Sequence, residues 1–214
     1  MSETARNGNL IIVSGPSGAG KSVLVGHVLR RMPHVRFSVS YTTRAPRGNE
    51  QDGVEYFFIE REAFQSLIRG DELLEWAEVH GNYYGTSRRF VDEVLRQGED
   101  VLLDIDVQGA RIIRAKRPEA VGVFILPPSY RVLRERLTRR SLDAGFEIEK
   151  RLKIACKEIG QYRNYDYLII NGELDSSVAE LESIVFGSRC RTAVRAESAK
   201  SILETFGGID AEDP

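Results

Sequence analysis

The chain has 214 residues, which is enough for one α/β domain with an insertion or for two small domains. Hydrophobic residues make up 42% and charged residues 29%, so the composition predicts a sizeable core under a soluble surface. The net charge of −2 argues against bulk binding to nucleic acid or to a membrane surface. No apolar run reaches membrane-spanning length.

The cysteine and histidine content bears on metal sites and on the cellular compartment. Only Cys156 and Cys190 occur, without a CxxC motif, and the three histidines are scattered along the chain. This pattern predicts two free thiols in a cytoplasmic protein and argues against a structural zinc site. The polar N-terminus does not have the features of a signal peptide.

Four short apolar runs predict strands buried on both faces of a sheet. They span residues 10–13, 101–105, 121–126 and 167–170. Helical patterns cover residues 21–32, 107–116, 129–140, 146–162 and 176–186. Strands that alternate with helices in this way predict an α/β fold with a parallel sheet.

Residues 38–98 have a different pattern, which predicts a small α+β insertion. Residues 54–59 and 73–80 are strand-like, and they lack long crossover helices. A helix follows over residues 87–97, with Ser87 as its N-cap and Gly98 at its end. Beyond Cys190 the polar tail predicts a short helix and a frayed end.

The segment GPSGAGKS follows the first predicted strand and precedes a helix, which is the context that a P-loop requires. Its backbone N–H groups and the helix N-terminus predict a cradle for phosphate oxygens. Lys21 would reach the β- and γ-phosphates and Ser22 would ligate Mg²⁺. An ordinary glycine-rich turn does not explain lysine and serine at these places. The whole motif is Gly15, Pro16, Ser17, Gly18, Ala19, Gly20, Lys21 and Ser22.

Asp104 and Asp106 end the second apolar run, and two interpretations stay open for them. A carboxylate beside a phosphate loop can hold Mg²⁺ directly or through its waters. Alternatively, an acid at this point caps the helix that follows, and Asp106 fits that role well.

Arg44 and Arg47 lie on either side of Pro46 in the stretch SYTTRAPRG, and they suggest a second anion site. Arginine binds phosphate bidentately and stays charged at every working pH. Two solvated loop arginines are the plainer interpretation. Hydroxyl groups crowded into the same insertion weaken it, and they belong to Tyr56, Tyr83, Tyr84 and Thr86.

Four motifs together resemble the guanylate kinase family over residues 9–186: GPSGAGKS, FSVSYTTRAPR, LLEWAEVHGNYYGTS and LLDIDVQG. The resemblance implies a P-loop NTPase-type parallel sheet flanked by helices, an α+β acceptor-binding insertion and a helical lid. The implied P-loop core covers residues 1–37, 99–129 and 161–190. The insertion covers 38–98, the lid 130–160 and a C-terminal extension 191–214.

The resemblance also implies which residues bind GMP. Its phosphate would contact Arg44, Arg47, Tyr56 and Tyr84, and its guanine would contact Ser40, Glu75, Thr86 and Asp104. Chemistry supports the role of Glu75, because a carboxylate accepts from both N1–H and N2–H₂ of guanine. Adenine has an acceptor at N1, and the resulting unpaired polar group costs about 1–3 kcal/mol.

In the lid and near the adenine, the resemblance implies Arg136, Arg140, Arg151 and Asn171. The implied catalytic residues are then Lys21, Arg44, Arg140 and Arg151. The family commonly has a Gly-Arg-Gly-Thr run where this chain has Arg139-Arg140-Ser141-Leu142. The loss of two glycines predicts a stiffer turn, in which Arg139 competes with Arg140 for the catalytic position.

The expected function is transfer of the γ-phosphoryl group of Mg·ATP to GMP. The acceptor phosphate oxygen is already anionic, so the reaction needs positioning and charge neutralisation and no general base. The alternatives are a P-loop kinase for a phosphorylated sugar and a non-catalytic phosphopeptide-binding module. Glu75 and the Tyr83–Tyr84 pair argue against the sugar, and the intact P-loop argues against the module. The oligomeric state stays open.

Overall fold

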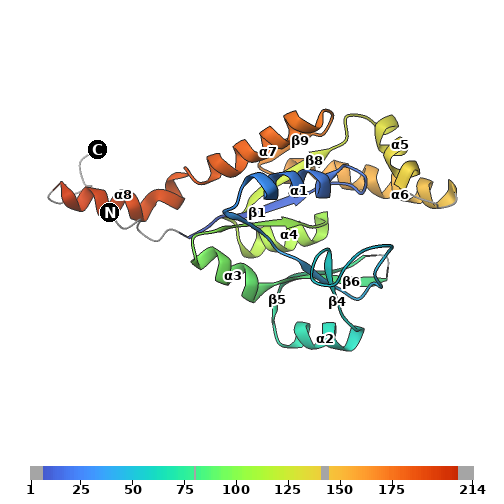
Figure 1. Cartoon of the computed structure of the whole chain (residues 1–214), viewed down its shortest axis with the longest axis horizontal. Helices are drawn as coiled ribbons and strands as arrows, with labels where there is room; N and C mark the ends of the chain where they lie inside the picture. The colour runs from blue at the N-terminus through green and yellow to red at the C-terminus, as the bar shows by residue number, and fades with distance from the viewer. Residues whose placement is uncertain (1–6, 80, 141–144, 207–214) are drawn as a thin grey trace.

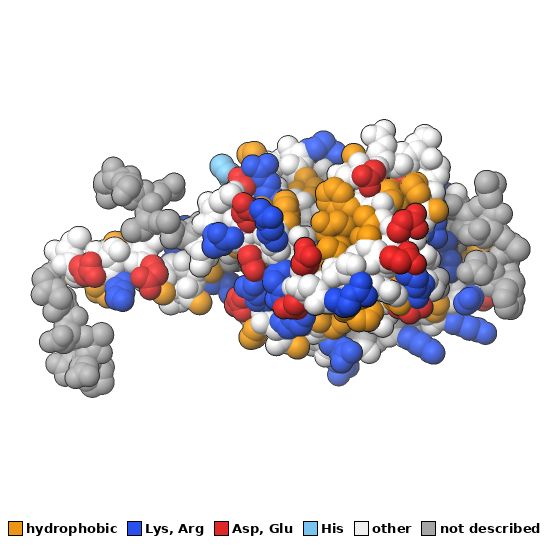
Figure 2. Space-filling view, turned by 90° about the horizontal axis from the view of Figure 1, so that it is seen from below, with side chains coloured by type: hydrophobic (Ala, Val, Ile, Leu, Met, Phe, Trp, Pro, Cys, Tyr) orange, Lys and Arg blue, Asp and Glu red, His pale blue; other side chains and the backbone are white. Residues whose placement is uncertain are grey.

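The computed structural model describes residues 7–79, 81–140 and 145–206, and two sheets dominate it (Figure 1). One sheet is parallel and lies among the large helices. The other is smaller and lies below it with α2 (Arg61–Arg69) in Figure 1. Seen from that side, basic and acidic side chains are interspersed around an apolar patch (Figure 2), in keeping with the small net charge.

The central sheet has the strand order β2-β7-β1-β8-β9, and all of its pairings are parallel. The predicted α/β class and the four predicted strands are confirmed. A fifth strand, β2, was missed because it has only three residues. The strands are β1 (Leu10–Ser14), β2 (Val35–Phe37), β7 (Asp100–Asp104), β8 (Val121–Leu126) and β9 (Tyr167–Ile170).

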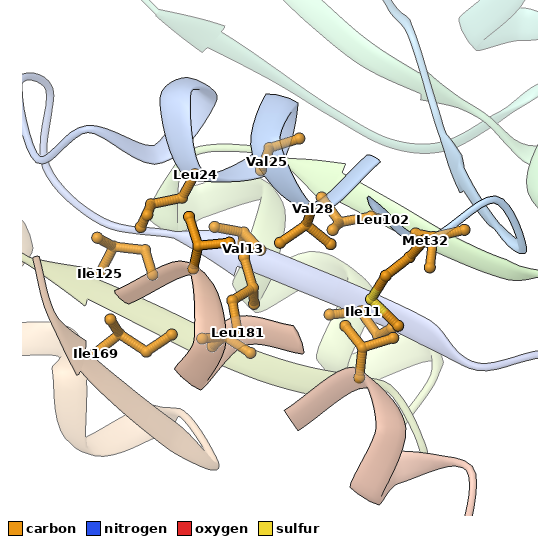
Figure 3. Packing of buried hydrophobic residues seen from close by; sticks show 14 of the residues in the cluster. Ile11, Val13, Leu24, Val25, Val28, Met32, Leu102, Ile125, Ile169 and Leu181 are labelled. Atoms are coloured by element: carbon orange, nitrogen blue, oxygen red, sulfur yellow. The ribbon is translucent and has the colours of Figure 1, made fainter. Parts of the chain in front are cut away.

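Strand β1 explains why a continuous apolar run forms here. Ile11 and Val13 pack on one face with Leu24 of α1 (Lys21–Arg31) and Leu181 of α7 (Leu174–Ser188), as Figure 3 shows. Leu10 and Ile12 pack on the opposite face with side chains of α3 (Arg88–Arg96) and α4 (Val107–Lys116). Because neighbouring side chains on a strand point to opposite faces, both sets must be apolar.

The prediction of two-sided burial is wrong for β9. This strand is at the edge of the sheet, and only Ile169 is buried. Leu168 is 44% exposed and Ile170 is 60% exposed. An apolar run has the same composition in a central and in an edge strand, so the sequence did not distinguish the two positions.

The smaller sheet has the order β4-β3-β6-β5 and mixes parallel and antiparallel pairings. Two of its strands were predicted, β4 (Tyr56–Phe58) and β5 (Leu73–Val79), with His80 outside the described residues. The strands β3 (Ser40–Thr42) and β6 (Asn82–Ser87) and helix α2 were missed. The β6 sequence NYYGTS reads as a turn, and only its pairing with β5 and β3 makes it a strand.

The remaining helices are α5 (Tyr130–Arg140), α6 (Gly145–Ile159), the 3₁₀ turn η1 (Gly160–Asn164) and α8 (Thr192–Thr205). Helices α5 and α6 share a small core of Leu133, Leu137, Leu152 and Ala155. Helix α8 extends away from the body of the molecule and buries none of its residues (Figure 1). Among the described residues, no helix combines the length and apolarity needed to span a membrane.

Candidate active site

The predicted P-loop lies between β1 and α1 at the carboxyl end of the central sheet. Gly15, Gly18 and Gly20 all have positive φ, a conformation that lets the backbone curl inward. At Gly15 a Cβ atom would lie 2.3 Å from the carbonyl oxygen of Ile125 in β8. Glycine is therefore needed at this position both for its backbone angle and for its close contact with the neighbouring strand.

Lys21 and Ser22 lie within the cradle that the loop forms. Lys21 Nζ donates to the carbonyl oxygen of Gly15 at 2.8 Å. Ser22 Oγ donates to Asp104 Oδ2 at 2.8 Å. A hydroxyl and a carboxylate oxygen are ligands that Mg²⁺ accepts, so this pair fits the expected metal.

The two acids after β7 have different local roles. Asp106 Oδ1 accepts from the backbone N–H groups of Gln108 and Gly109, at 2.9 and 2.8 Å. It is thus the N-cap of α4, as one of the two interpretations proposed. Asp104 instead faces Ser22 of the P-loop.

Side chains from α5, from α6 and from the residue that follows β9 contact the P-loop. Arg151 Nη2 in α6 donates to Ser17 Oγ at 2.8 Å. Arg136 in α5 donates to the carbonyl oxygens of Ala19 and Asn171, at 3.2 and 2.9 Å. Asn171 Nδ2 also donates to the Ala19 oxygen, at 2.7 Å. Arg140 ends α5, and its side chain lies outside the described residues, as do Ser141 and Leu142.

Glu158 is a neighbour of the P-loop that the sequence reasoning missed. It lies seven residues after Arg151 in α6, close to the backbone of Ser17. Burial raises the pKa of Glu158, and the charge of Lys21 opposes this shift. Its Oε2 is buried and has no partner among the described residues. The two-turn spacing from Arg151 was the signal that could have found it.

The predicted acceptor-phosphate residues come together around Arg44, which is only 9% exposed. The Tyr56 ring centre lies 5.4 Å from the guanidinium carbon of Arg44, and the Tyr84 hydroxyl lies close to the same guanidinium group. Burial raises the pKa of Tyr56 to about 12, and the charge of Asp104 adds to this shift. Tyr56 therefore keeps its proton and stays a hydrogen-bond donor at neutral pH. The side chain of Arg47 is exposed.

Glu50, beside Arg44, is a second residue that the sequence reasoning missed. Its carboxylate binds the Arg44 guanidinium through two hydrogen bonds, at 2.9 and 3.0 Å. It also accepts from the backbone N–H of Arg47 at 2.8 Å. The spacing of three residues from Arg47 allows such a turn, but nothing in the sequence pairs Glu50 with Arg44.

The predicted guanine-binding residues lie on the smaller sheet and at its junction with the core. Glu75 is 4% exposed and accepts from Thr86 Oγ1 at 2.7 Å, across the β5–β6 pairing. Burial raises the pKa of Glu75 to about 7, and the charge of Asp106 contributes. Ser40 is half-buried and pairs with Tyr56 between β3 and β4. Trp76, the next residue along β5, is 41% exposed.

Gly109 in α4 lies directly beside Glu75 and was also missed. A Cβ atom at this position would lie 2.8 Å from Glu75 Oε2, which is closer than a real Cβ atom approaches. Any larger residue would therefore displace the carboxylate or the helix. The sequence motif contained this glycine, but its close approach to β5 is visible only in the fold.

A parallel sheet with a P-loop, beside a second cluster of cationic and hydroxyl groups, defines a P-loop phosphotransferase. Comparison with known proteins identifies the family. The guanylate kinase family model matches residues 7–188. The chain belongs to the guanylate kinase family, and it is accordingly an enzyme, a nucleoside monophosphate kinase.

Individual relatives agree with this assignment. The chain is 49% identical to a guanylate kinase of Koribacter versatilis over 203 residues, which cover 92% of this chain and 87% of the relative. It is also 49% identical to a guanylate kinase of Geobacter metallireducens over 187 residues, which cover 87% of this chain and 92% of the relative. A crystal structure of guanylate kinase from Anaplasma phagocytophilum superimposes with a TM-score of 0.76 at 32% identity, covering 88% of this chain and 90% of the other.

Proposed function

We propose that the chain transfers the γ-phosphoryl group of ATP to GMP, giving ADP and GDP. The observation that carries this proposal is the position of Asp104 between the two anion sites. Its carboxylate accepts from Ser22 of the P-loop, and its charge raises the pKa of Tyr56 in the acceptor site. A donor phosphate on the P-loop and an acceptor phosphate at Arg44 would thus lie on either side of Asp104, an arrangement that suits transfer between them.

The proposed donor site holds the ATP phosphates on the backbone N–H groups of residues 15–22. Lys21 would exchange its bond to the Gly15 oxygen for a phosphate oxygen. Ser22 would hold Mg²⁺, with Asp104 contributing through water, and the bound metal would neutralise charge on the β- and γ-phosphates. Arg136 and Asn171 already contact the loop and would border the adenine side.

The proposed acceptor site divides between phosphate and base. Arg44, Arg47, Tyr56 and Tyr84 would bind the GMP phosphate as cations and hydroxyl donors. Glu75 would accept from N1–H and N2–H₂ of guanine. Thr86, Ser40 and Asp104 would complete the base pocket.

Transfer in this site needs no general base, because the attacking phosphate oxygen is already anionic. Lys21 and Arg44 would neutralise charge from the two substrates. Arg151 and Arg140 would add charge from the lid, and Arg151 already lies at Ser17. The exposed, unpaired Cys156 and Cys190 support the cytoplasm as the compartment.

The test is ADP formation with ATP and Mg²⁺ in the presence of GMP, AMP, dUMP or CMP. We expect turnover with GMP and at least tenfold lower kcat/KM with AMP. Equal rates with AMP and GMP would contradict the guanine assignment. Full activity in Glu75→Lys would instead favour a phosphorylated sugar as the acceptor.

A further inference from the structure

We infer that Glu50 is a positioning residue that holds Arg44 and Arg47 in the arrangement that receives the acceptor phosphate. The inference rests on the proposed GMP site. Glu50 touches neither reacting group in that site and would act through the two arginines. It lies in the loop between β3 and β4, six residues after Arg44 and three after Arg47.

The contact with Arg44 fixes the plane of the guanidinium group. Nη1 donates to Glu50 Oε2 at 2.9 Å, and Nη2 donates to Glu50 Oε1 at 3.0 Å. Nη1 also donates to the carbonyl oxygen of Ala45 at 2.7 Å. These bonds use both hydrogens of Nη1 and one of Nη2, so Arg44 still has N–H groups to offer to a phosphate.

The contact with Arg47 fixes the backbone of the same loop. The Arg47 N–H donates to Glu50 Oε2 at 2.8 Å, and the Glu50 N–H donates to the Arg47 oxygen at 3.0 Å. These reciprocal bonds close a turn that contains Gly48 at positive φ. One carboxylate therefore links the buried side chain of Arg44 to the backbone of Arg47 and sets their relative position.

The charge state of Glu50 suits this role. Although burial opposes it, the hydrogen bonds from Arg44 and from the Arg47 N–H lower the pKa of Glu50. The carboxylate is thus ionised throughout the neutral range. With one negative charge against two arginines, the cluster keeps a net positive charge to attract a phosphate.

A competing account is that Glu50 occupies the place of the phosphate and inhibits binding. The two accounts predict opposite signs. If Glu50 positions the arginines, its removal weakens GMP binding. If Glu50 competes with the phosphate, its removal strengthens GMP binding.

The experiment compares Glu50→Ala and Glu50→Gln with the wild-type chain, using steady-state kinetics and calorimetric titration with GMP and with Mg·ATP. We expect the KM and Kd for GMP to rise roughly 10- to 100-fold in Glu50→Ala, because small misplacements of a binding group have effects of this size. Glu50→Gln keeps one acceptor and should be intermediate. The KM for ATP should stay within about twofold in both variants, since the P-loop is unchanged.

Glu55→Gln is the matched control, because Glu55 Oε2 accepts from the Gln51 N–H at 2.8 Å in the same loop, whereas the bonds to Arg44 and to the Arg47 N–H come from Glu50. Its GMP KM should change less than that of Glu50→Gln. An equal rise of the GMP KM in Glu55→Gln and Glu50→Gln would overturn the inference, because it would show a general loosening of the loop. Thermal unfolding checks that each variant is folded. If Glu50→Ala does not fold, Glu50→Gln still provides the test.

Arg44→Ala and the double variant Arg44→Ala/Glu50→Ala separate this inference from the proposed function. If Glu50 acts partly through Arg44, adding Glu50→Ala to Arg44→Ala should cost less GMP affinity than Glu50→Ala costs in the wild-type chain, and the remaining loss measures the effect through Arg47. If GMP affinity falls in Arg44→Ala but not in Glu50→Ala, the role of Glu50 is overturned and the proposed acceptor site still holds. Tighter GMP binding in Glu50→Ala would establish competition instead. No loss in Arg44→Ala would overturn the acceptor site and this inference together.

Discussion

Glu75 is a carboxylate whose surroundings decide both its charge and its selectivity. It is buried between Thr86 and Gly109, and desolvation raises its pKa to about 7. Such a group is protonated in a large fraction of molecules at neutral pH. We therefore expect its ionisation to be coupled to the binding of a base that offers two donors, and also to the stability of the fold.

The first prediction concerns GMP binding and pH. Because only the ionised carboxylate accepts from both donors of guanine, GMP affinity should increase between about pH 6 and pH 8. The GMP phosphate also titrates, near pH 6, and this changes GMP affinity too. The control is therefore Glu75→Gln, in which the phosphate still titrates but residue 75 does not. Calorimetric titration at several pH values measures both curves. Parallel curves would show that Glu75 does not titrate in this range.

The second prediction concerns stability in the absence of ligand. The folded-state pKa of about 7 lies above the ordinary 4.5, so protonated Glu75 favours the folded state. That contribution is complete below about pH 4.5 and is lost as the pH rises through about 7. Glu75→Gln should therefore gain stability relative to the wild-type chain between pH 5 and pH 8, as measured by thermal unfolding. A difference that stays constant with pH would contradict the raised pKa.

The third prediction concerns Gly109. In Gly109→Ala the new Cβ would meet Glu75 Oε2 at 2.8 Å, and the KM for GMP should rise about tenfold with the KM for ATP unchanged. Gly187→Ala is the control, because Gly187 lies in α7 with nothing within 4 Å of a new Cβ. Both variants can gain about 1 kcal/mol of helix propensity. Identical GMP kinetics in the two variants would show that the contact does not position Glu75.

At the scale of elements, strands of similar composition differ in what they bury. Strand β1 is central and covered by helices on both faces. Within the described part of the chain β9 pairs with β8 alone, and it exposes most of its side chains. The central position also places the P-loop, since the loop begins where β1 ends between β7 and β8. The core of the sheet thus holds the P-loop.

The fourth prediction compares the same substitution in these two strands. Ile11 is fully buried, so Ile11→Ala should destabilise the chain by about 2–5 kcal/mol. Ile170 is 60% exposed, so Ile170→Ala should cost about 1 kcal/mol or less. Urea unfolding of both variants measures the difference. A large cost at Ile170 would mean that something other than this chain covers β9.

At the scale of the whole molecule, the two proposed anion sites belong to different sheets. The P-loop lies in the central sheet, and Arg44 and Glu75 lie in or beside the smaller one. The chain passes between the sheets near Phe37 and again near Gly98, which has positive φ. A change of backbone angle at these two places can move one site relative to the other.

The fifth prediction is that the molecule closes when both sites are filled. Phosphoryl transfer must exclude water, because otherwise ATP is hydrolysed without transfer. Hinges are expected near residues 37–40, at Gly98 and on both sides of the segment 130–160. Small-angle scattering with a bisubstrate inhibitor should give a smaller radius of gyration than the free chain. GMP and ATP analogues tested singly should give intermediate values, and superimposable profiles would contradict closure.

The sequence by itself determined those features whose cause lies in neighbouring residues. The P-loop needs glycine, lysine and serine in one short run, the buried strands need continuous apolar residues, and Ser87 and Asp106 cap the helices that directly follow them. For the same reason, the two arginines of SYTTRAPRG indicated an anion site. Matching four such motifs in order was enough to identify the family.

Only the tertiary structure decided what depends on contacts between distant residues. Strand β6 reads as a turn until β5 and β3 pair with it, and β9 reads as buried until its place at the edge is known. Glu50, Gly109 and Glu158 have ordinary local sequences. They matter because folding brings them against Arg44, Glu75 and the P-loop, and such proximity is created by packing between elements.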